Sequence, residues 1–319
     1  NIGAETQGLA GLQMLPHLDA FVDRDAYSQL SFPPSASSFD KTSDQLVVFL
    51  NAWYGRPFME WPPPDFLEPV TLAMHFQEAL EVLQGKSTES LMDKILELPP
   101  KGTNRTKPSF FQSHGPIGAR DTKTLEFFQE NGIRSFFSAC MTMTLGLPSV
   151  PNPDTILIID APDVKQLKAV VPADILANAT TLTQDLVGPL ADSSLSRYLY
   201  SFFRLTLYPK AKLVITARLH VALPAAALGR PVVFMHGEKL PGGGGNRLDG
   251  LDNFIHAVRG FTVPKNFDWH NPLPNPKSAE FLRYRNRLKQ MAVCHSGVSD
   301  GARKFGMVPL DWDAGDEFQ

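Results

Sequence analysis

The chain has 319 residues, a formal net charge of −3 and two cysteines. Its length exceeds the size at which a single hydrophobic core usually stops growing, so two domains are expected. The small net charge and the lack of a basic stripe argue against nucleic acid as a partner. No apolar run approaches the roughly 20 residues that span a bilayer, so no membrane span is expected in this segment.

The first predicted element is an Ala/Leu-rich helix that follows the opening residues Asn1 to Gln7 and continues to Leu15, where Pro16 ends it. The strand that normally precedes such a helix in an α/β protein is missing, and the first residue is not Met. We therefore expect that the chain has been trimmed. The compartment stays open between a bacterial cytoplasm and a eukaryotic Golgi lumen.

An apolar strand is predicted at residues 46–50, and the aromatic, proline-rich segment 51–64 follows it. Sugar rings pack well on aromatic faces, so Trp53, Tyr54 and Trp61 are candidates for contact with a sugar. The alternative is that these aromatic side chains hold the segment in the core of its own domain.

A helix between two strands is predicted in residues 109–139. Its parts are the strand Ser109–Gln112, the glycine-containing loop Ser113–Arg120, the N-cap Asp121, the helix Thr122–Glu130, the stop at Asn131 and Gly132, and the strand Arg134–Ala139. Arg120 lies at a helix start, where a cation opposes the macrodipole, so the pattern favours an anionic ligand. The alternative is a surface ion pair between Arg120 and Asp121. His114, in the same loop, is a further candidate.

A second unit of this kind is predicted in residues 212–235. Its parts are the strand Leu213–Ile215, the N-cap Thr216, a helix over residues 217–228, Gly229 at C′ and the strand Val232–Met235. The strand end and the helix start of a β-α-β unit share a crevice that favours phosphate or carboxylate, and Arg218 and His220 lie at its mouth. Pro224 cannot donate to the carbonyl of His220, so the first turn is expected to be irregular. The alternative is a buried arginine paired with a structural acid, beside a core histidine.

Glu238 and Lys239 follow the last of these strands, so they are expected to face the same crevice. The four glycines at 242–245 lack the spacing of a phosphate loop and indicate a flap or an insertion. A helix is then predicted over Ser278–Met291. Its expected apolar contacts are Phe281, Leu282, Tyr284 and Leu288.

No metal site is expected. Asp23, Arg24 and Asp25 resemble the Asp-x-Asp motif of GT-A glycosyltransferases, but no second carboxylate cluster accompanies them, and no pair of His or Cys lies at zinc spacing. Cys140, in a strand-like segment, and Cys294 are expected to be free thiols. The alternation of strands and helices makes the expected fold α/β.

The order of these segments resembles the polysaccharide pyruvyltransferase family. The resemblance is carried by the opening Asn-x-Gly, by PIGARD at 116–121, by FSACMTMTL at 137–145, and by ITARLH at 215–220 followed by Gly229 and Pro231. It extends from Asn1 to about Phe254. Ala4 stands where members of the family usually have an acidic residue, with Glu5 next to it, and Val221 stands where a glycine often follows the histidine.

The resemblance implies two Rossmann-like lobes that face each other across a central cleft, in the manner of GT-B glycosyltransferases. The expected N-terminal lobe is 1–147, on the acceptor side, and the C-terminal lobe is 148–275, on the donor side. Residues 276–319 would form a C-terminal helix and tail that cross back to the first lobe. The implied activity transfers the pyruvyl group of phosphoenolpyruvate, a co-substrate, to a sugar diol of a glycan. The product would be a pyruvate ketal, with no further cofactor.

Within this scheme His220 is expected to transfer a proton, because an imidazole titrates near neutral pH. Arg218 and Arg120 would hold the phosphate and carboxylate, since a guanidinium fork matches such anions bidentately. The further candidates for donor binding are His114, Glu238 and Lys239. The candidates for acceptor binding are Asn1, Glu5, Trp53, Tyr54 and Trp61.

Two other classes of function stay open. A GT-B glycosyltransferase would use the same cleft, with an arginine and a histidine, to hold the diphosphate of a nucleotide sugar. A catalytically inactive glycan-binding homologue is the other; Ala4 favours it, whereas Arg120, Arg218 and His220 disfavour it.

Overall fold

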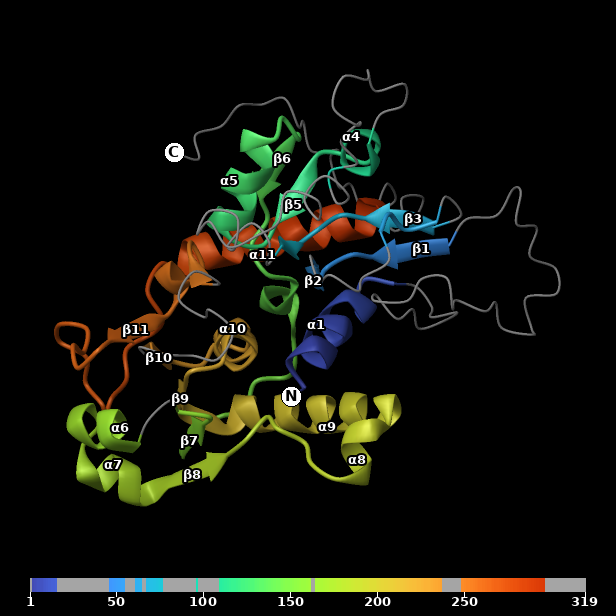
Figure 1. Cartoon of the computed structure of the whole chain (residues 1–319). Coiled ribbons are helices and arrows are strands. Elements are labelled where there is room, and N and C mark those ends of the chain that lie inside the picture. Colours follow the sequence, from blue (N-terminus) through green and yellow to red (C-terminus); the bar gives the residue numbers. More distant parts are fainter. Residues whose placement is uncertain are drawn as a thin grey trace.

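The computed structural model describes residues 2–15, 46–54, 61–64, 67–76, 96, 109–161, 164–236 and 248–295. Within these ranges the protein has a mixed α/β fold with a five-stranded parallel sheet, and three two-stranded parallel pairs lie in the first half of the chain (Figure 1). The predicted α/β class is therefore confirmed. None of the helices in the described ranges is long and apolar enough to cross a membrane.

The large sheet has the strand order β11-β10-β9-β7-β8. Its strands are β7 (Thr155–Ile159), β8 (Ala179–Leu182), β9 (Ala211–Thr216), β10 (Val232–His236) and β11 (His256–Arg259). The chain adds β8 on one side of β7 and then crosses to β9 on the other side, so the winding direction reverses between β7 and β9. In open parallel sheets the carboxyl ends of the strands at such a switch point are the usual place for a ligand.

Different helices cover the two faces of this sheet. Side chains alternate along each strand, so that Leu213 shares a core with α6 (Val164–Val170) and α7 (Ala173–Asn178), whereas Val214 shares the other core with α10 (Leu219–Ala227). Both side chains are fully buried. This explains why β9 is a continuous apolar run, since a parallel strand covered on both faces needs no polar side chains.

The first half of the chain forms its parallel pairs around an aromatic core. β1 (Leu46–Phe49) pairs with β3 (Leu67–Val70), β2 (Trp53–Tyr54) with β4 (His75–Phe76), and β5 (Ile117–Ala119) with β6 (Ser135–Phe137). A bridge between Met74 and Ala119 links the second pair to the third. The aromatic members of this core are Tyr54, Trp61, Phe76, Phe110, Phe111, Phe127 and Phe128.

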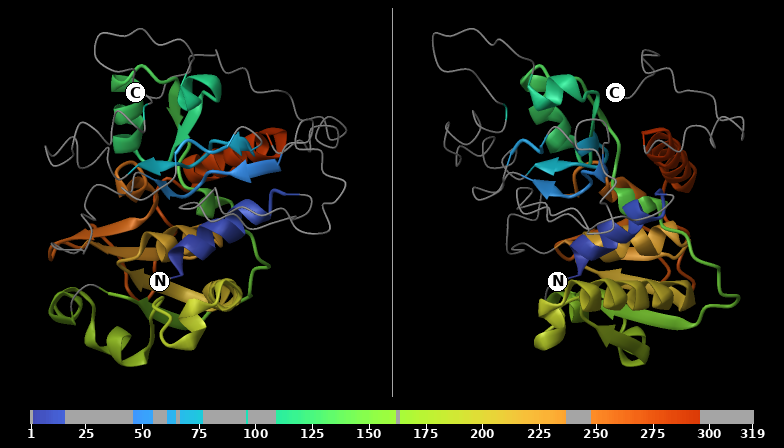
Figure 2. Two further views of the ribbon diagram at one scale, coloured as in Figure 1. Left: turned by 45° about the vertical axis from the view of Figure 1, so that its right-hand side comes forward. Right: turned by 90° about the vertical axis from the view of Figure 1, so that its right-hand side faces the viewer.

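The short 3-10 helix η3 (Met141–Thr144) lies where the two halves meet. It contacts α1 (Gly3–Leu12), α10 and α11 (Ser278–His295), and one apolar core runs through this junction into the large sheet. Both views in Figure 2 show α1 between the strands of the first half and α9 (Ser194–Leu207). α11 also reaches β6, where the ring of Tyr284 lies 5.4 Å from that of Phe137. The remaining short elements are α4 (Phe110–Ser113), α5 (Thr122–Glu130), α8 (Pro189–Asp192), η4 (Tyr208–Lys210) and η6 (Asp252–Phe254).

Local sequence signals predicted some of these elements correctly and others wrongly. α5 spans Thr122–Glu130 as expected, and the carboxylate of Asp121 caps it by accepting the N–H of Thr124 at 2.9 Å. The strand predicted at Ser109–Gln112 is wrong, because Ser109 and Gln112 form a capping box that starts α4. The strand of this unit, β5, lies inside the predicted loop.

Two side chains of the predicted elements also differ from expectation. Leu282 was expected to pack inward from α11, but it lies on the outer side of the helix and is 46% exposed. Cys140 was expected in a strand-like segment and instead precedes η3 as its N-cap. Both Cys140 and Cys294 are free thiols, as predicted.

Gly118 is required by the close approach of β5 to its neighbours. A Cβ at this position would lie 3.0 Å from the Cβ of Ser138 and 3.1 Å from the Cα of Leu72. We expect Gly118→Ala to lower the free energy of unfolding by about 1–3 kcal/mol, measured by urea denaturation, because backbone atoms would have to move. The control is Gly146→Ala, whose Cβ would meet no described atom within 4 Å. Equal stability of the two variants would contradict the prediction.

Candidate functional site

Arg218 and Asp160 meet at the switch point of the large sheet. Asp160 directly follows β7, and Arg218 lies two residues after β9. The Nε of Arg218 donates to Oδ2 of Asp160 at 3.1 Å, and its Nη2 donates to Oδ2 of Asp185 at 3.3 Å. The side chain of Arg218 is 38% exposed. The predicted position of Arg218 at the strand end is thus correct, and two carboxylates orient its guanidinium.

The first turn of α10 is irregular, as predicted. His220 has φ −82° and ψ 18°, outside the helical region, because Pro224 has no N–H to donate to its carbonyl. The amide of Gln184 donates to that carbonyl at 3.1 Å instead. The predicted N-cap, Thr216, is wrong: the helix begins after Arg218, and the Thr216 hydroxyl accepts the N–H of Arg218 at 3.0 Å.

Gln184 also joins this turn to the start of the chain. Its backbone N–H donates to Asp160 at 3.0 Å, and its carbonyl accepts the N–H of Ile2 at 3.2 Å. Its side chain is hydrogen-bonded to Tyr208, whose pKa is raised by burial. One buried glutamine therefore brings together the opening residues and His220, which the sequence analysis treated as separate candidates, and joins both to Asp160, which it did not name.

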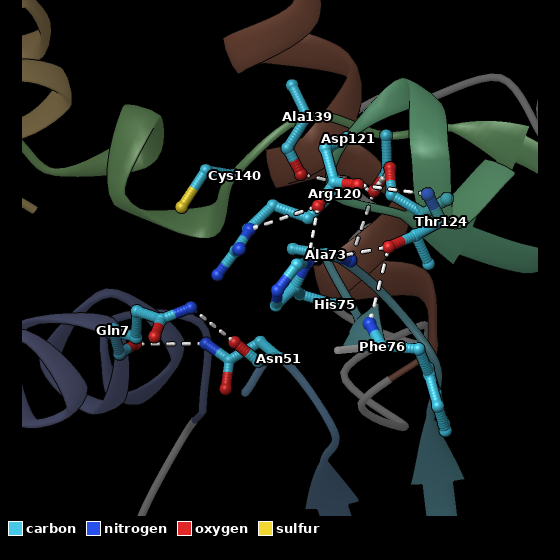
Figure 3. Close-up of polar contacts among 12 residues, drawn as sticks. Gln7, Asn51, Ala73, His75, Phe76, Arg120, Asp121, Thr124, Ala139 and Cys140 are labelled. Atoms are coloured by element: carbon cyan, nitrogen blue, oxygen red, sulfur yellow. Dashed lines mark hydrogen bonds and ion pairs between the residues drawn. The ribbon is translucent and has the colours of Figure 1, made fainter. Parts of the chain in front are cut away.

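Arg120 is the most unusual charged residue in the described structure. It follows β5, its backbone N–H donates to the carbonyl of Met74 at 2.8 Å, and its side chain is completely buried. Its Nε lies 3.6 Å from Oδ2 of Asp121, but none of its three guanidinium nitrogens makes a hydrogen bond within the described residues. In Figure 3 the guanidinium points toward Cys140 and α1.

Asp121 and His75 form a buried pair beside this arginine. Nδ1 of His75 lies 2.6 Å from Oδ2 of Asp121, and both side chains are fully buried (Figure 3). Burial raises the pKa of Asp121, but His75, Arg120 and the N–H of Thr124 together outweigh burial, so the pKa lies below its ordinary value. The carboxylate is therefore held in its charged form.

Cys140 completes the surroundings of Arg120. Its thiol is fully buried and lies 3.1 Å from the hydroxyl of Thr142. Burial raises the pKa of the thiol, although the charge of Arg120 opposes that effect. The thiol is therefore neutral near pH 7 and does not neutralise the arginine.

α1 connects the two groups of residues. Its first turn is bonded to Gln184, and further along the helix Gln7 exchanges two hydrogen bonds with Asn51, which follows β1 (Figure 3). Glu5 is not available as a free acid: its Oε1 accepts a hydrogen bond from Nε of Arg197 in α9 at 2.6 Å. Glu5 therefore anchors α1 on α9, and its expected contact with an acceptor stays a prediction.

The aromatic candidates lie mostly in the core. Tyr54 and Trp61 are buried, with ring centroids 5.9 Å apart, which favours the alternative that they hold the segment in its own domain. Trp53 is half-buried, and its ring lies 6.2 Å from that of His75. His114 follows α4 at the start of the loop, and its ring centroid lies 4.5 Å from that of Phe110; its expected role in donor binding stays a prediction. Three candidate positions lie outside the described residues: Asn1, Glu238 and Lys239. The Asp23–Asp25 motif, which was not expected to hold a metal, also lies outside them.

The sequence analysis missed His75. The residue is a single histidine between the apolar residues Met74 and Phe76, a pattern that fits a core position equally well. The pairing of β2 with β4 and the bridge from Met74 to Ala119 bring it to Asp121, and both are contacts between distant parts of the chain.

Fold and site together define an α/β protein with one arginine at the switch point of a parallel sheet and a second, buried arginine at the junction of its two halves. Comparison of the chain with models of known families, with curated proteins and with solved structures finds no match.

The lowered pKa of Asp121 makes a testable contribution to stability. A carboxylate with a depressed pKa in the folded state stabilises the protein above its unfolded pKa of about 3.9, and that stability is lost as the pH falls through the folded value. We expect Asp121→Asn to lower the free energy of unfolding near pH 7 by about 3 kcal/mol. Its stability should also fall less steeply than that of the unmodified protein below pH 4 or so.

Urea denaturation at a series of pH values measures both effects. The matched control is Asp154→Asn, a substitution of an exposed aspartate just before β7. The control should follow the unmodified protein at every pH. If the free energy of unfolding of Asp121→Asn falls below pH 4 as steeply as that of the unmodified protein, then Asp121 is not the titrating partner of His75 and Arg120.

Proposed function

We propose that this protein transfers the pyruvyl group of phosphoenolpyruvate to a sugar diol of a glycan and forms a pyruvate ketal. The observation that carries the proposal is the buried guanidinium of Arg120, which has no hydrogen-bond partner among the described residues. A buried, incompletely paired charge costs several kcal/mol. A bound anion would supply the missing partner of the guanidinium and offset this cost. Proteins retain groups that lower stability where their function needs them.

Phosphoenolpyruvate matches the cationic groups of the site by its chemistry. It carries a carboxylate and a phosphate, and each accepts paired hydrogen bonds from a guanidinium fork. Arg120 and Arg218 supply two such forks, from the two halves of the chain. Arg120 stands in PIGARD and Arg218 in ITARLH, two of the segments by which the sequence resembles the polysaccharide pyruvyltransferase family.

The proposal includes two Rossmann-like lobes in a GT-B arrangement. It is supported by the five-stranded parallel sheet with its switch point, and by the separate parallel pairs around a second core in the first half. α11 packs against β6 of that first half, which fits a helix that crosses back.

In the proposed reaction a proton is added to C3 of the enol while one sugar hydroxyl attacks C2 and gives up its own proton. The bond from C2 to the phosphate oxygen then breaks, and the neighbouring hydroxyl attacks C2 and loses its proton to the departing phosphate, so that inorganic phosphate leaves and the ketal ring closes. His220 is the proposed proton-transfer group, because it lies on the irregular turn beside Arg218 and its backbone is fixed by Gln184. Asp160 and Asp185 would orient Arg218 toward the phosphate.

A glycosyltransferase that uses a nucleotide sugar is the second candidate. The specific observation in its favour is the position of Arg218 at the switch point, where parallel α/β sheets commonly bind nucleotides. The two candidates differ in the donor, so a binding measurement separates them.

The thermal unfolding midpoint with and without millimolar phosphoenolpyruvate tests the donor, with UDP and GDP measured in parallel. A ligand at a hundred times its dissociation constant adds about 2.7 kcal/mol to stability, which raises the midpoint measurably. We expect phosphoenolpyruvate to stabilise the unmodified protein and the control Arg230→Met, at the opposite end of α10. It should not stabilise Arg120→Met or Arg218→Met. Stabilisation by UDP or GDP alone would identify a glycosyltransferase.

Arg120→Met also gives a prediction without ligand. Methionine fills a similar volume without a charge, so replacing an arginine that lacks hydrogen bonds should raise the free energy of unfolding by about 1–3 kcal/mol. If Arg120 and Asp121 instead formed a stabilising ion pair, Arg120→Met would lower the free energy of unfolding, because the charge of Asp121 would lose one of its partners. Urea denaturation of the two proteins in phosphate-free buffer decides between the outcomes, and a destabilised variant would remove the main support for an anion site.

A further inference from the structure

The outer face of α9 is apolar and exposed. Four large apolar residues share one side of this helix. The first is Leu195, and the others follow it by four, seven and eight residues: Leu199, Phe202 and Phe203. Each is more than half exposed. Single exposed apolar residues are common on soluble proteins, but a continuous stripe of four large ones is not.

The orientation of α9 is fixed by its other face, so the stripe cannot turn inward. Arg197 holds Glu5, and the hydroxyl of Ser201 lies 2.8 Å from that of Thr6, both in α1. Arg204 donates to the carbonyl of Thr183 at 3.0 Å, and Leu205 belongs to the main core. The inner face is therefore fully used by the chain's own contacts.

Two more exposed apolar residues lie in the segment just before α9. Val187 and Leu190, in the segment that leads through α8 into α9, are 80% and 59% exposed, and Figure 1 shows α8 beside the first turns of α9. Six large apolar residues on two neighbouring segments, each more than half exposed, are more than the single exposed residues that are common on soluble proteins. A standard interface buries roughly 800 Å² on each partner, and the stripe on α9 would form the apolar centre of such an interface.

The charges of α9 indicate which partner fits this surface. Its charged residues are Arg197 and Arg204, and both bind inward. A helix that lies on a lipid surface usually carries lysines or arginines along its polar flank, which α9 does not offer. An uncharged apolar face can instead oppose a copy of itself without repulsion, and the cores of interfaces are similarly depleted in charge and rich in aromatic residues.

We propose that the protein forms a dimer in which α9 crosses α9 of a second copy about a twofold axis. In an antiparallel crossing centred at the level of Ser201, whose own side chain faces α1, Leu199 lies opposite the partner's Phe203. The start of one α9 then lies beside the end of the other, so Asp192, at the end of α8, comes to the same end of the interface as the partner's Lys210, in η4 after α9. Both side chains are exposed. A twofold interface forms each such contact twice, so this charge pair would set the register.

Light scattering coupled to size-exclusion chromatography tests the proposal on the full chain at micromolar to submillimolar concentration. We expect a mass twice the 35.2 kDa of one chain. Leu199→Asp should weaken the dimer about 100-fold or more, since it places two like charges in the apolar centre. The matched control is Leu282→Asp, an exposed leucine on α11, which should remain dimeric. A monomeric unmodified protein, or a dimeric Leu199→Asp variant, would overturn the proposal.

A charge exchange tests the register separately. Asp192→Lys should weaken the dimer about tenfold, and adding Lys210→Asp in the same chain should restore it, because the pair is then reversed across the axis. Failure of the double variant to recover would contradict the antiparallel crossing. The response of Leu199→Asp to phosphoenolpyruvate should be that of the unmodified protein, so the dimer and the proposed function are tested independently.

Discussion

The missing N–H of Pro224 organises the carboxyl edge of the large sheet. A proline in the second turn of α10 leaves the carbonyl of His220 without its helical partner, and this half-buried carbonyl takes another donor. Gln184 supplies it, and the same residue holds Ile2 and Asp160. The irregular turn, the start of α1 and the orientation of Arg218 through Asp160 therefore depend on one another. A proline that weakens a helix locally thus links three distant segments.

The two arginines of the candidate site are in opposite electrostatic situations. Arg218 is partly exposed and bonded to two aspartates, so water and carboxylates both compensate its charge. Arg120 is excluded from water, and Asp121, the one carboxylate paired with it among the described residues, is shared with His75. The fold tolerates this because Asp121 also caps α5 and stays ionised. A buried charge that is only partly compensated is what the proposed anion site would require, since an ion pair is strongest where solvent is absent.

The sequence predicted those parts of the fold and site that depend on local signals. Asp121 as a cap and Gly229 after α10 each act within a few residues, and both are in place. The same local rules failed at Ser109, where a capping box outweighed an apolar run. About half of the site could be named, because Arg120, Arg218 and His220 stand at element ends. The burial of Arg120 and the part played by His75 could not, since they arise from the pairing of β2 with β4 and from the bridge between Met74 and Ala119.

α9 shows why a sequence pattern leaves a helix face undecided. Leu205 and Tyr208 on one side and Leu199 and Phe202 on the other make the segment apolar almost all round, which is typical of a helix covered on both faces. The contacts with α1, through Arg197 and Ser201, decide which side turns inward. α9 lies between its exposed stripe and α1, and Ile2, just before α1, donates to the carbonyl of Gln184. A partner on that stripe would therefore contact the outer face of α9 and leave in place the hydrogen bonds by which Gln184 holds Asp160 and His220.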